Sequence, residues 1–203
     1  MKAAILCGGI GKRMHPLTLT RPKVIIPVAN APIVEHILLA ARGAGIRDFL
    51  FVVGYKSPLI KKYFGNGSKW NVRIKYAEQR EQLGTAHALG LAKNFADGRF
   101  FVLNGDVIVS QECLRSAIRT KCDGLIVVKK VDNPQELGVV VTDGRRVTKI
   151  VEKPTKRLSN LASSGIFVLD CKIFDAISKT SLSQRGEYEV TSSLNTLLKS
   201  GYA

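Results

Sequence analysis

The sequence predicts an α/β fold built on a mostly parallel sheet with helices on both faces. In residues 1–123, short apolar runs alternate with segments of helical periodicity, and this alternation is typical of parallel sheets. From residue 124 on, strand-like runs follow one another, so residues 124–203 are expected to be richer in strands. The 203 residues and 45% hydrophobic content suit one domain with a substantial core, and no internal repeat or linker divides them.

The elements of the first half are expected to alternate strictly. Apolar runs predict strands at residues 2–7, 49–53, 72–77 and 99–103. Helical spacing predicts helices at residues 33–44, 57–64, 85–95 and 111–120. Gly45 supplies a stop for the first helix. Ser57 suits the N-cap of the second helix and Pro58 its first position.

The second half is expected to begin with strands and end with two helices. The strands are expected at residues 125–131, 139–142, 147–151 and 162–169. The dipeptide Asp143-Gly144 predicts a turn between the second and third of them.

Composition excludes several classes of protein. No stretch is apolar for long enough to span a bilayer, and the apolar start at residues 3–7 is too short for a signal peptide. The four cysteines form neither a CxxC pair nor a metal-ligand set, so we expect free thiols in a reducing cytoplasm.

The formal net charge of +15 points to an anionic partner. Nucleic acid is disfavoured as that partner, because the basic residues are scattered, aromatic content is only 7% and no nucleic-acid motif is present. A polyanionic small substrate explains part of the charge equally well, and a generally basic surface explains the rest.

A glycine-rich segment, Leu6 to Met14, directly follows the first predicted strand. Glycines at such a position let backbone N–H groups approach a phosphate closely. The spacing is not that of a P-loop, which needs a glycine at Leu6 and a Ser or Thr at Arg13. A dinucleotide fingerprint is also a poor match, because Met14 stands at the third glycine position. Taken alone, the segment is equally well an ordinary turn.

The surroundings of this segment favour phosphate binding. Residues 1–34 contain no acidic side chain, and prolines make the stretch a stiff, mostly non-helical loop. Within it, Arg13 suits bidentate phosphate contact and Lys23 suits a point charge on a phosphate. Ligands of open α/β sheets bind at the carboxyl ends of the strands, which is where this loop begins.

Two further motifs fall at element boundaries. Gly84 and Thr85 open the predicted helix 85–95, and Thr85 also suits its cap. His87, one turn later, is interpreted as structural because no partner is evident. Asp106 follows the strand 99–103 in an Asn-Gly-Asp sequence, which is either a simple turn or a hard oxygen ligand for Mg²⁺ at the same sheet edge.

The N-terminal segment resembles the signature of the sugar-1-phosphate nucleotidyltransferase family. The match runs through Gly8-Gly9-x-Gly11-x-Arg13-Met14-x-Pro16-Leu17-Thr18, with Pro22-Lys23 and Pro27-Val28 after it. The resemblance implies a Rossmann-like three-layer α/β/α nucleotidyltransferase fold, a nucleoside triphosphate, a sugar-1-phosphate and Mg²⁺. It implies that residues 1–123 form the nucleotide-binding half and residues 124–203 the sugar-binding half of a single domain.

The resemblance also assigns residues to the nucleotide. It implies that Leu6, Gly8 and Gly9 hold the base and phosphates, that Gln79, Gly84 and Thr85 contact the base, and that Arg13, Lys23 and Asp106 are catalytic, with Asp106 binding the metal. A carboxamide at Gln79 accepts from N3–H of uracil or thymine, whereas guanine offers two donors that a carboxylate matches better. Gln79 therefore favours UTP or dTTP, and the stretch is similar to uridylyltransferase domains of bifunctional UDP-N-acetylglucosamine-forming enzymes.

The sugar side carries weaker signals. By resemblance Gly138 lies at the sugar hydroxyls, Glu152 accepts from them, Lys153 lies near the sugar phosphate, and Ser163 stands where relatives often have Asn. The segment 186–191 resembles a family helix start, with Ser192 in place of the usual Asp. Glucose-1-phosphate and N-acetylglucosamine-1-phosphate are the expected acceptors.

The expected chemistry needs no general base. The nucleophile is a phosphate monoester with a second pKa of about 6, so it is largely ionised at neutral pH. Catalysis then rests on alignment and charge neutralisation. Two alternatives stay open: a mannose-1-phosphate guanylyltransferase, and a non-catalytic domain of this fold, such as those in translation-initiation exchange factors. A homo-oligomer also stays open.

Relatives usually continue beyond the point matched by Ala203 with a strand and a Trp-x-Asp-x-Gly segment that supplies a second metal ligand. We therefore expect the 203-residue chain to bind nucleotide but to turn over slowly, unless Glu187, Glu189 or another residue completes the metal site.

Overall fold

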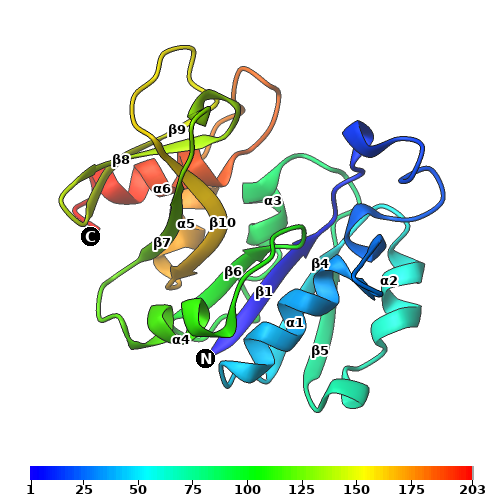
Figure 1. Ribbon diagram of the computed structural model, residues 1–203. Helices are drawn as coiled ribbons and strands as arrows, with labels where there is room; N and C mark the ends of the chain where they lie inside the picture. Colours follow the sequence, from blue (N-terminus) through cyan, green and yellow to red (C-terminus); the bar gives the residue numbers. More distant parts are fainter. Residues whose placement is uncertain (203) are drawn as a thin grey trace.

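A mixed eight-stranded sheet forms the centre of the molecule, in a computed structural model that describes residues 1–202 (Figure 1). The strand order is β5-β4-β1-β6-β10-β8-β9, and β7 pairs separately with β10. Its parallel part consists of β1 (Lys2–Cys7), β4 (Asp48–Val53), β5 (Arg73–Glu78) and β6 (Phe100–Asn104). The predicted α/β fold with a mostly parallel first half is therefore confirmed.

Helices cover both faces of the sheet. The side chains of β1 point alternately to the two faces and are buried on both. Ala3, Ile5 and Cys7 belong to the hydrophobic core under α1 (Ile33–Gly43), α2 (Ser57–Phe64) and α4 (Gln111–Arg119). Ala4 belongs to a second core under α3 (Thr85–Gly90), α5 (Lys172–Ser178) and α6 (Val190–Lys199). Because successive side chains of a strand point to opposite faces, a strand buried on both faces must be apolar throughout.

The second half is richer in strands, as the sequence predicts. It contains β7 (Leu125–Lys130), β8 (Gly138–Asp143), β9 (Arg146–Glu152) and β10 (Leu161–Leu169). β8 and β9 form an antiparallel hairpin around the predicted turn at Asp143-Gly144. β10 runs antiparallel to β6 and so joins the two halves in one sheet. In Figure 1 the β8–β9 hairpin and the N-terminal loop lie at the same edge of the molecule.

Helix starts differ from the prediction in two places. The N-cap of α2 is Lys56, in a left-handed conformation, so the prediction of Ser57 as the cap is wrong. Ser57 instead donates from Oγ to Glu78 Oε1 at 2.8 Å, across to the end of β5. Likewise α3 is capped by Gly84, and Thr85 uses Oγ1 to accept from the backbone N–H of Val190 at 3.0 Å.

Two element lengths also differ from the sequence prediction. α3 ends at Gly90, and turns replace the rest of the predicted helix to residue 95. Residues 8–32 contain no α-helix, as expected, but they form short 3-10 turns at η1 (Lys12–Met14) and η2 (Lys23–Ile25). A small hairpin of β2 (Pro27–Val28) and β3 (Ala31–Pro32) follows.

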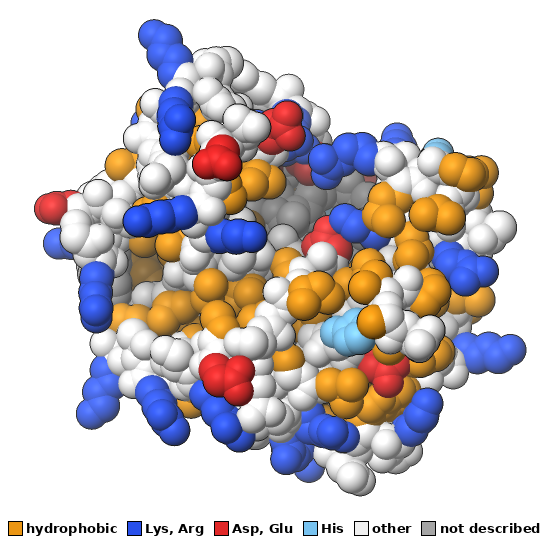
Figure 2. Space-filling view, viewed as in Figure 1, with side chains coloured by type: hydrophobic (Ala, Val, Ile, Leu, Met, Phe, Trp, Pro, Cys, Tyr) orange, Lys and Arg blue, Asp and Glu red, His pale blue; other side chains and the backbone are white. Residues whose placement is uncertain are grey.

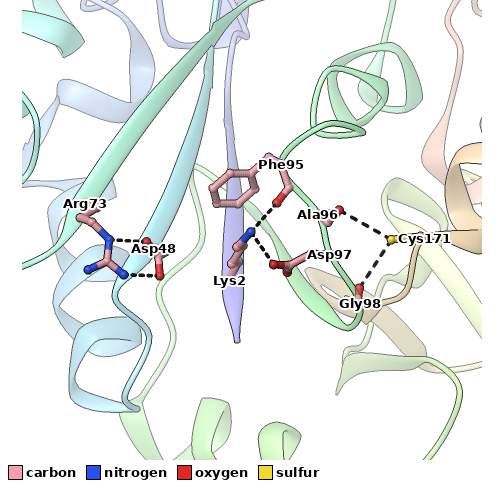
Figure 3. Close-up of polar contacts among 8 residues, drawn as sticks. All are labelled: Lys2, Asp48, Arg73, Phe95, Ala96, Asp97, Gly98 and Cys171. Atoms are coloured by element: carbon pink, nitrogen blue, oxygen red, sulfur yellow. Dashed lines mark hydrogen bonds and ion pairs between the residues drawn. The ribbon is translucent and has the colours of Figure 1, made fainter.

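Ion pairs hold the amino ends of the strands, at the edge opposite the N-terminal loop (Figure 3). Arg73 forms a bidentate pair with Asp48, with nitrogen–oxygen distances of 2.6 and 2.7 Å, and this contact lowers the pKa of the Asp48 carboxyl. Lys2 Nζ contacts Asp97 at 2.7 Å and donates to the carbonyl oxygen of Phe95 at 3.0 Å. These contacts are structural and leave the carboxyl ends of the strands for a ligand.

All four cysteines are free thiols, as expected from the sequence. Across residues 1–202, no helix has the length and apolar character needed to cross a bilayer.

Candidate functional site

A cavity of about 480 Å³ opens at the carboxyl ends of β1 and β6. Figure 2 shows this face hollowed between the β8–β9 region and the N-terminal loop, with basic and acidic side chains at the rim. Eight of the residues predicted for the nucleotide and metal line it, and they are Leu6, Gly8, Gly9, Lys23, Gln79, Gly84, Thr85 and Asp106. The fold thus gathers into one cavity residues that are up to a hundred positions apart in the sequence.

Lys23 and Asp106 contact each other in the wall of this cavity. Lys23 Nζ lies 2.5 Å from Asp106 Oδ2, and both side chains are partly exposed. Lys23 comes from the N-terminal loop, and Asp106 follows β6 in the turn that Gly105 allows to pack on Leu6. Here a Cβ on Gly105 would lie 2.7 Å from the Leu6 carbonyl oxygen, so a side chain there would displace Asp106.

Arg13 lies beside the cavity rather than in it. It lines an adjoining pocket of about 440 Å³ that shares Gly11, Lys12 and Lys23 with the main cavity. The N-terminal loop is held by one hydrogen bond within it and by another from Tyr55. Thr18 Oγ1 donates to the carbonyl oxygen of Gly11 at 2.9 Å, and the Tyr55 hydroxyl donates to the carbonyl oxygen of Thr18 at 3.0 Å.

Gln79 is nearly buried, and its carboxamide has a defined orientation. Its Nε2 donates to the carbonyl oxygen of Gly84 at 3.1 Å and contacts Nδ1 of His87 at 3.1 Å. Its Oε1 points at Gly8, where a Cβ would lie 2.5 Å away. His87 therefore has a partner, and the interpretation that it has none is wrong. The residue at position 8 must be glycine for Gln79 to reach the cavity in this orientation.

The helix start at Gly84 is clamped by the segment before α6. Gly84 has φ 114°, and a Cβ there would lie 2.5 Å from the carbonyl oxygen of Tyr188. The Tyr188 backbone accepts from Ala86 N–H and donates to the carbonyl oxygen of Leu83, both at 2.8 Å. This docking brings the neighbouring Glu187 into the cavity wall.

The predicted sugar residues lie together on the second half of the sheet. Gly138, Glu152 and Ser163 come from β8, β9 and β10, and a Cβ on Gly138 would lie 3.1 Å from Glu152 Oε2 and 3.7 Å from Ser163 Cβ. Lys153 follows β9 with φ 42° and an exposed side chain, and its backbone N–H donates to the carbonyl oxygen of Leu137. None of these four residues lines the 480 Å³ cavity.

Arg185 connects this cluster to the cavity, and it is not among the residues predicted from the sequence. Its guanidinium lies 3.5 Å from Glu152, 3.3 Å from Glu189 and 4.0 Å from Glu187. Burial, and then the charge of Glu189, raise the pKa of Glu152, while Arg185 opposes them. The only sequence signal for this arrangement was the Arg-Gly-Glu-Tyr-Glu run beside the helix start.

Gln82 and Asn104 also line the cavity, although neither was predicted as a site residue. Glu187, named from the sequence as one residue that could complete the metal site, lines it too. Within residues 1–202, no group of three or more His, Cys, Asp or Glu side chains forms a metal site made by the protein alone. The second metal ligand implied after residue 203 lies outside the described residues.

The chain belongs to the nucleotidyl transferase family, whose model matches residues 2–203. It is 40% identical to the bifunctional protein GlmU of Methanocaldococcus jannaschii, over 98% of this chain and 47% of that protein. It is 38% identical to the low-salt glycan biosynthesis nucleotidyltransferase Agl11 of Haloferax volcanii, over 100% of this chain and 58% of that protein. The chain thus spans about half the length of the curated relatives it matches.

Solved structures agree with the predicted fold. A Bacillus anthracis protein assigned as a glucose-1-phosphate thymidylyltransferase superposes with a TM-score of 0.89 at 31% identity, covering 100% of this chain and 84% of that chain. A UDP-glucose pyrophosphorylase in complex with UDP-glucose superposes with a TM-score of 0.88 over 100% of this chain and 88% of that one. At 22% identity, this second likeness supports the fold alone.

Proposed function

We propose that this chain transfers a nucleoside monophosphate from UTP or dTTP to a sugar-1-phosphate and releases pyrophosphate. Glucose-1-phosphate and N-acetylglucosamine-1-phosphate are the proposed acceptors. The observation that carries the proposal is the single cavity that combines the Gln79 acceptor, the glycine loop and the Lys23–Asp106 pair. Residues 1–123 would bind the nucleotide and residues 124–203 the sugar phosphate. The free thiols suit a cytoplasmic location for the proposed reaction.

The orientation of Gln79 supports a uracil or thymine base. Both Nε2 hydrogens have acceptors in the protein, so the group presented beside Gly8 is the acceptor Oε1. Uracil and thymine offer N3–H to such an acceptor, whereas cytosine and adenine present a ring nitrogen that also accepts. Guanine offers two adjacent donors, and a single carboxamide oxygen matches only one of them.

Nucleotide preference is expected to follow this geometry. UTP or dTTP should bind at least about tenfold more tightly than GTP or CTP, a difference of about 1.4 kcal/mol. Titration calorimetry with each triphosphate measures it. Gln79→Glu is the informative variant, because a carboxylate cannot donate to the carbonyl oxygen of Gly84 and must turn away from it. Its two oxygens then suit the two donors of guanine, and the preference should shift toward GTP. Tighter binding of GTP to the unmodified chain would favour the guanylyltransferase alternative instead.

The triphosphate is proposed to lie along the glycine loop. Gly8 and Gly9 offer backbone N–H groups, and Lys12, Lys23 and the adjoining Arg13 supply positive charge. Arg13 suits a bidentate contact with one phosphate, whereas the lysines act as point charges. The absence of acidic residues before Glu35 leaves these cations uncompensated within their own segment.

The cavity fits Mg²⁺ bound mainly through the substrate. Asp106 offers one carboxylate in the wall, and phosphate oxygens and water would supply the remaining ligands of the ion. When bound, the ion would neutralise charge on the phosphates of the nucleotide. Lys23 and Asp106 would hold that part of the nucleotide in place.

No side chain needs to act as a base in the proposed transfer. The sugar phosphate is already ionised at neutral pH, and one of its oxygens attacks the α-phosphorus while pyrophosphate leaves in line. The protein contributes alignment and positive charge, through Arg13 and Lys23 on the nucleotide side. Release of pyrophosphate from UTP with a panel of sugar-1-phosphates tests the activity, and no release with any of them would favour the non-catalytic alternative.

Arg185 is expected to affect the sugar phosphate more than the nucleotide. Arg185→Ala removes the guanidinium that contacts Glu152 and opposes the rise in its pKa, so the carboxyl loses the partner that positions it toward the sugar hydroxyls. The KM for the sugar phosphate should rise about tenfold, while the Kd for UTP stays within about twofold. Steady-state kinetics and calorimetry give the two values. Arg145→Ala, in the exposed β8–β9 turn, serves as the control, and an equal loss of UTP affinity would contradict the assignment.

A further inference from the structure

The base-contacting carboxamide of Gln79 is held by two partners with different roles. The carbonyl oxygen of Gly84 accepts both from Gln79 Nε2 at 3.1 Å and from the backbone N–H of Ala88 at 3.1 Å. Since a carbonyl oxygen only accepts, the group facing it must be the NH₂ of Gln79. The orientation of the amide is therefore set by chemistry as well as by its placement beside Gly8.

The same geometry fixes the proton of His87. An NH₂ group only donates, so Nδ1 of His87, 3.1 Å away, must be the acceptor. The neutral ring then carries its hydrogen on Nε2. This tautomer uses the second N–H of Gln79 and leaves Oε1 as the one group that the side chain can offer to a ligand.

We propose that His87 is a positioning residue for nucleobase selection, acting through Gln79. Gly84 alone satisfies one amide hydrogen and leaves the other free, and a side chain tied at one point can turn its second N–H toward the cavity. With His87 in place both hydrogens are committed, and the cavity presents only an acceptor. The inference rests on the proposed function, because it assigns Gln79 to the base.

The structure offers a close pair of substitutions to test this role. Asn has an oxygen near the position of the imidazole Nδ1 and can accept from Gln79, whereas Leu has the same branched shape without an acceptor. His87→Leu should lower the preference for UTP over CTP by about tenfold, or about 1.4 kcal/mol. His87→Asn should keep most of the preference. His36→Leu, the same exchange on α1, is the control, because His36 contacts the backbone of Val28 and does not line the cavity.

Binding constants for UTP and CTP, measured by calorimetry on each variant, decide between a positioning role and a purely structural one. A structural defect would lower the binding affinity for UTP and for CTP by the same factor. Thermal unfolding reports any loss of stability. An equal loss of affinity for UTP and for CTP in His87→Leu would overturn the inference. So would a His87→Asn variant that behaves like His87→Leu.

A nucleotide-free measurement separates this inference from the proposed function. The ¹⁵N spectrum of the His87 ring should show the Nε2–H tautomer, with a hydrogen-bond coupling between a Gln79 amide proton and Nδ1. An Nδ1–H tautomer would overturn the inference directly. Failure of the proposed function would appear differently, as an unmodified chain that prefers GTP or CTP while the ring retains the Nε2–H tautomer.

Discussion

Asp106→Ala is expected to lower turnover by about a thousandfold, the size of effect seen when one group that stabilises transition-state charge is removed. Asp106 is the carboxylate at the tip of β6 that lines the cavity and contacts Lys23. Without it, a divalent cation on the phosphates has no anchor on β6. Pyrophosphate release at saturating UTP, sugar-1-phosphate and Mg²⁺ is the measurement.

The fold should survive this substitution, because Asp106 is partly exposed and, among residues 1–202, its side chain pairs only with Lys23. Circular dichroism and thermal unfolding check that expectation. Asp106→Asn is the matched control, since it keeps the shape and removes the charge. In EDTA, both variants should bind UTP at least as tightly as the unmodified chain, because a negative charge near the phosphates has been removed. Retention of most of the turnover would remove Asp106 from the proposed site.

The nucleotide side of the cavity could be predicted from the sequence because local rules govern it. The carboxyl ends of parallel strands lie at one edge of a sheet, so the segments that follow β1 and β6 must lie close together there. Gly8 and Asp106 are adjacent to apolar runs that are easily recognised as strands. The same reasoning placed Lys23 on a restrained loop at that edge, although not its contact with Asp106.

The role of His87 could not be predicted, because it depends on orientation rather than on position. Gln79 precedes α3 and His87 lies within it, and their contact depends on the positive φ of Gly84, which stands between them as the N-cap of α3. A sequence pattern shows neither that backbone conformation nor which atom of the amide faces the ring. Thr85 and Ser57 illustrate the same point: both have the chemistry of a cap, but each was used for a contact with a distant element.

Arg185 was missed for a different reason. Its partners Glu152, Glu187 and Glu189 are brought together by the pairing of β9 and by the docking of the segment before α6 on Gly84. In the local sequence, the Arg-Gly-Glu run cannot be distinguished from ordinary charged residues on a solvent-exposed surface. Long-range pairing of charges is thus the part of this site that composition and periodicity do not specify.

Lys23→Ala is expected to separate metal binding from turnover. Lys23 Nζ lies 2.5 Å from Asp106 Oδ2, so in the nucleotide-free chain we expect the ammonium to compete with a divalent cation for this carboxylate. Removing it should tighten binding of Mn²⁺ or Mg²⁺ to the nucleotide-free chain several-fold, by about 0.5–1 kcal/mol for a partly exposed pair. Turnover should nevertheless fall by about a hundredfold or more, because the triphosphate loses a point charge that offsets the charge of the transition state.

Calorimetric metal titration of the nucleotide-free chain and pyrophosphate release give the two values. Lys12→Ala is the matched control, since Lys12 lines the same cavity, whereas the ion pair with Asp106 is made by Lys23. This variant should lower the affinity for UTP modestly and leave metal binding unchanged. The opposite changes in the Lys23 variant are the decisive result, because general damage to the cavity lowers both quantities together. If metal affinity falls along with turnover, Lys23 supports the carboxylate rather than competing for it.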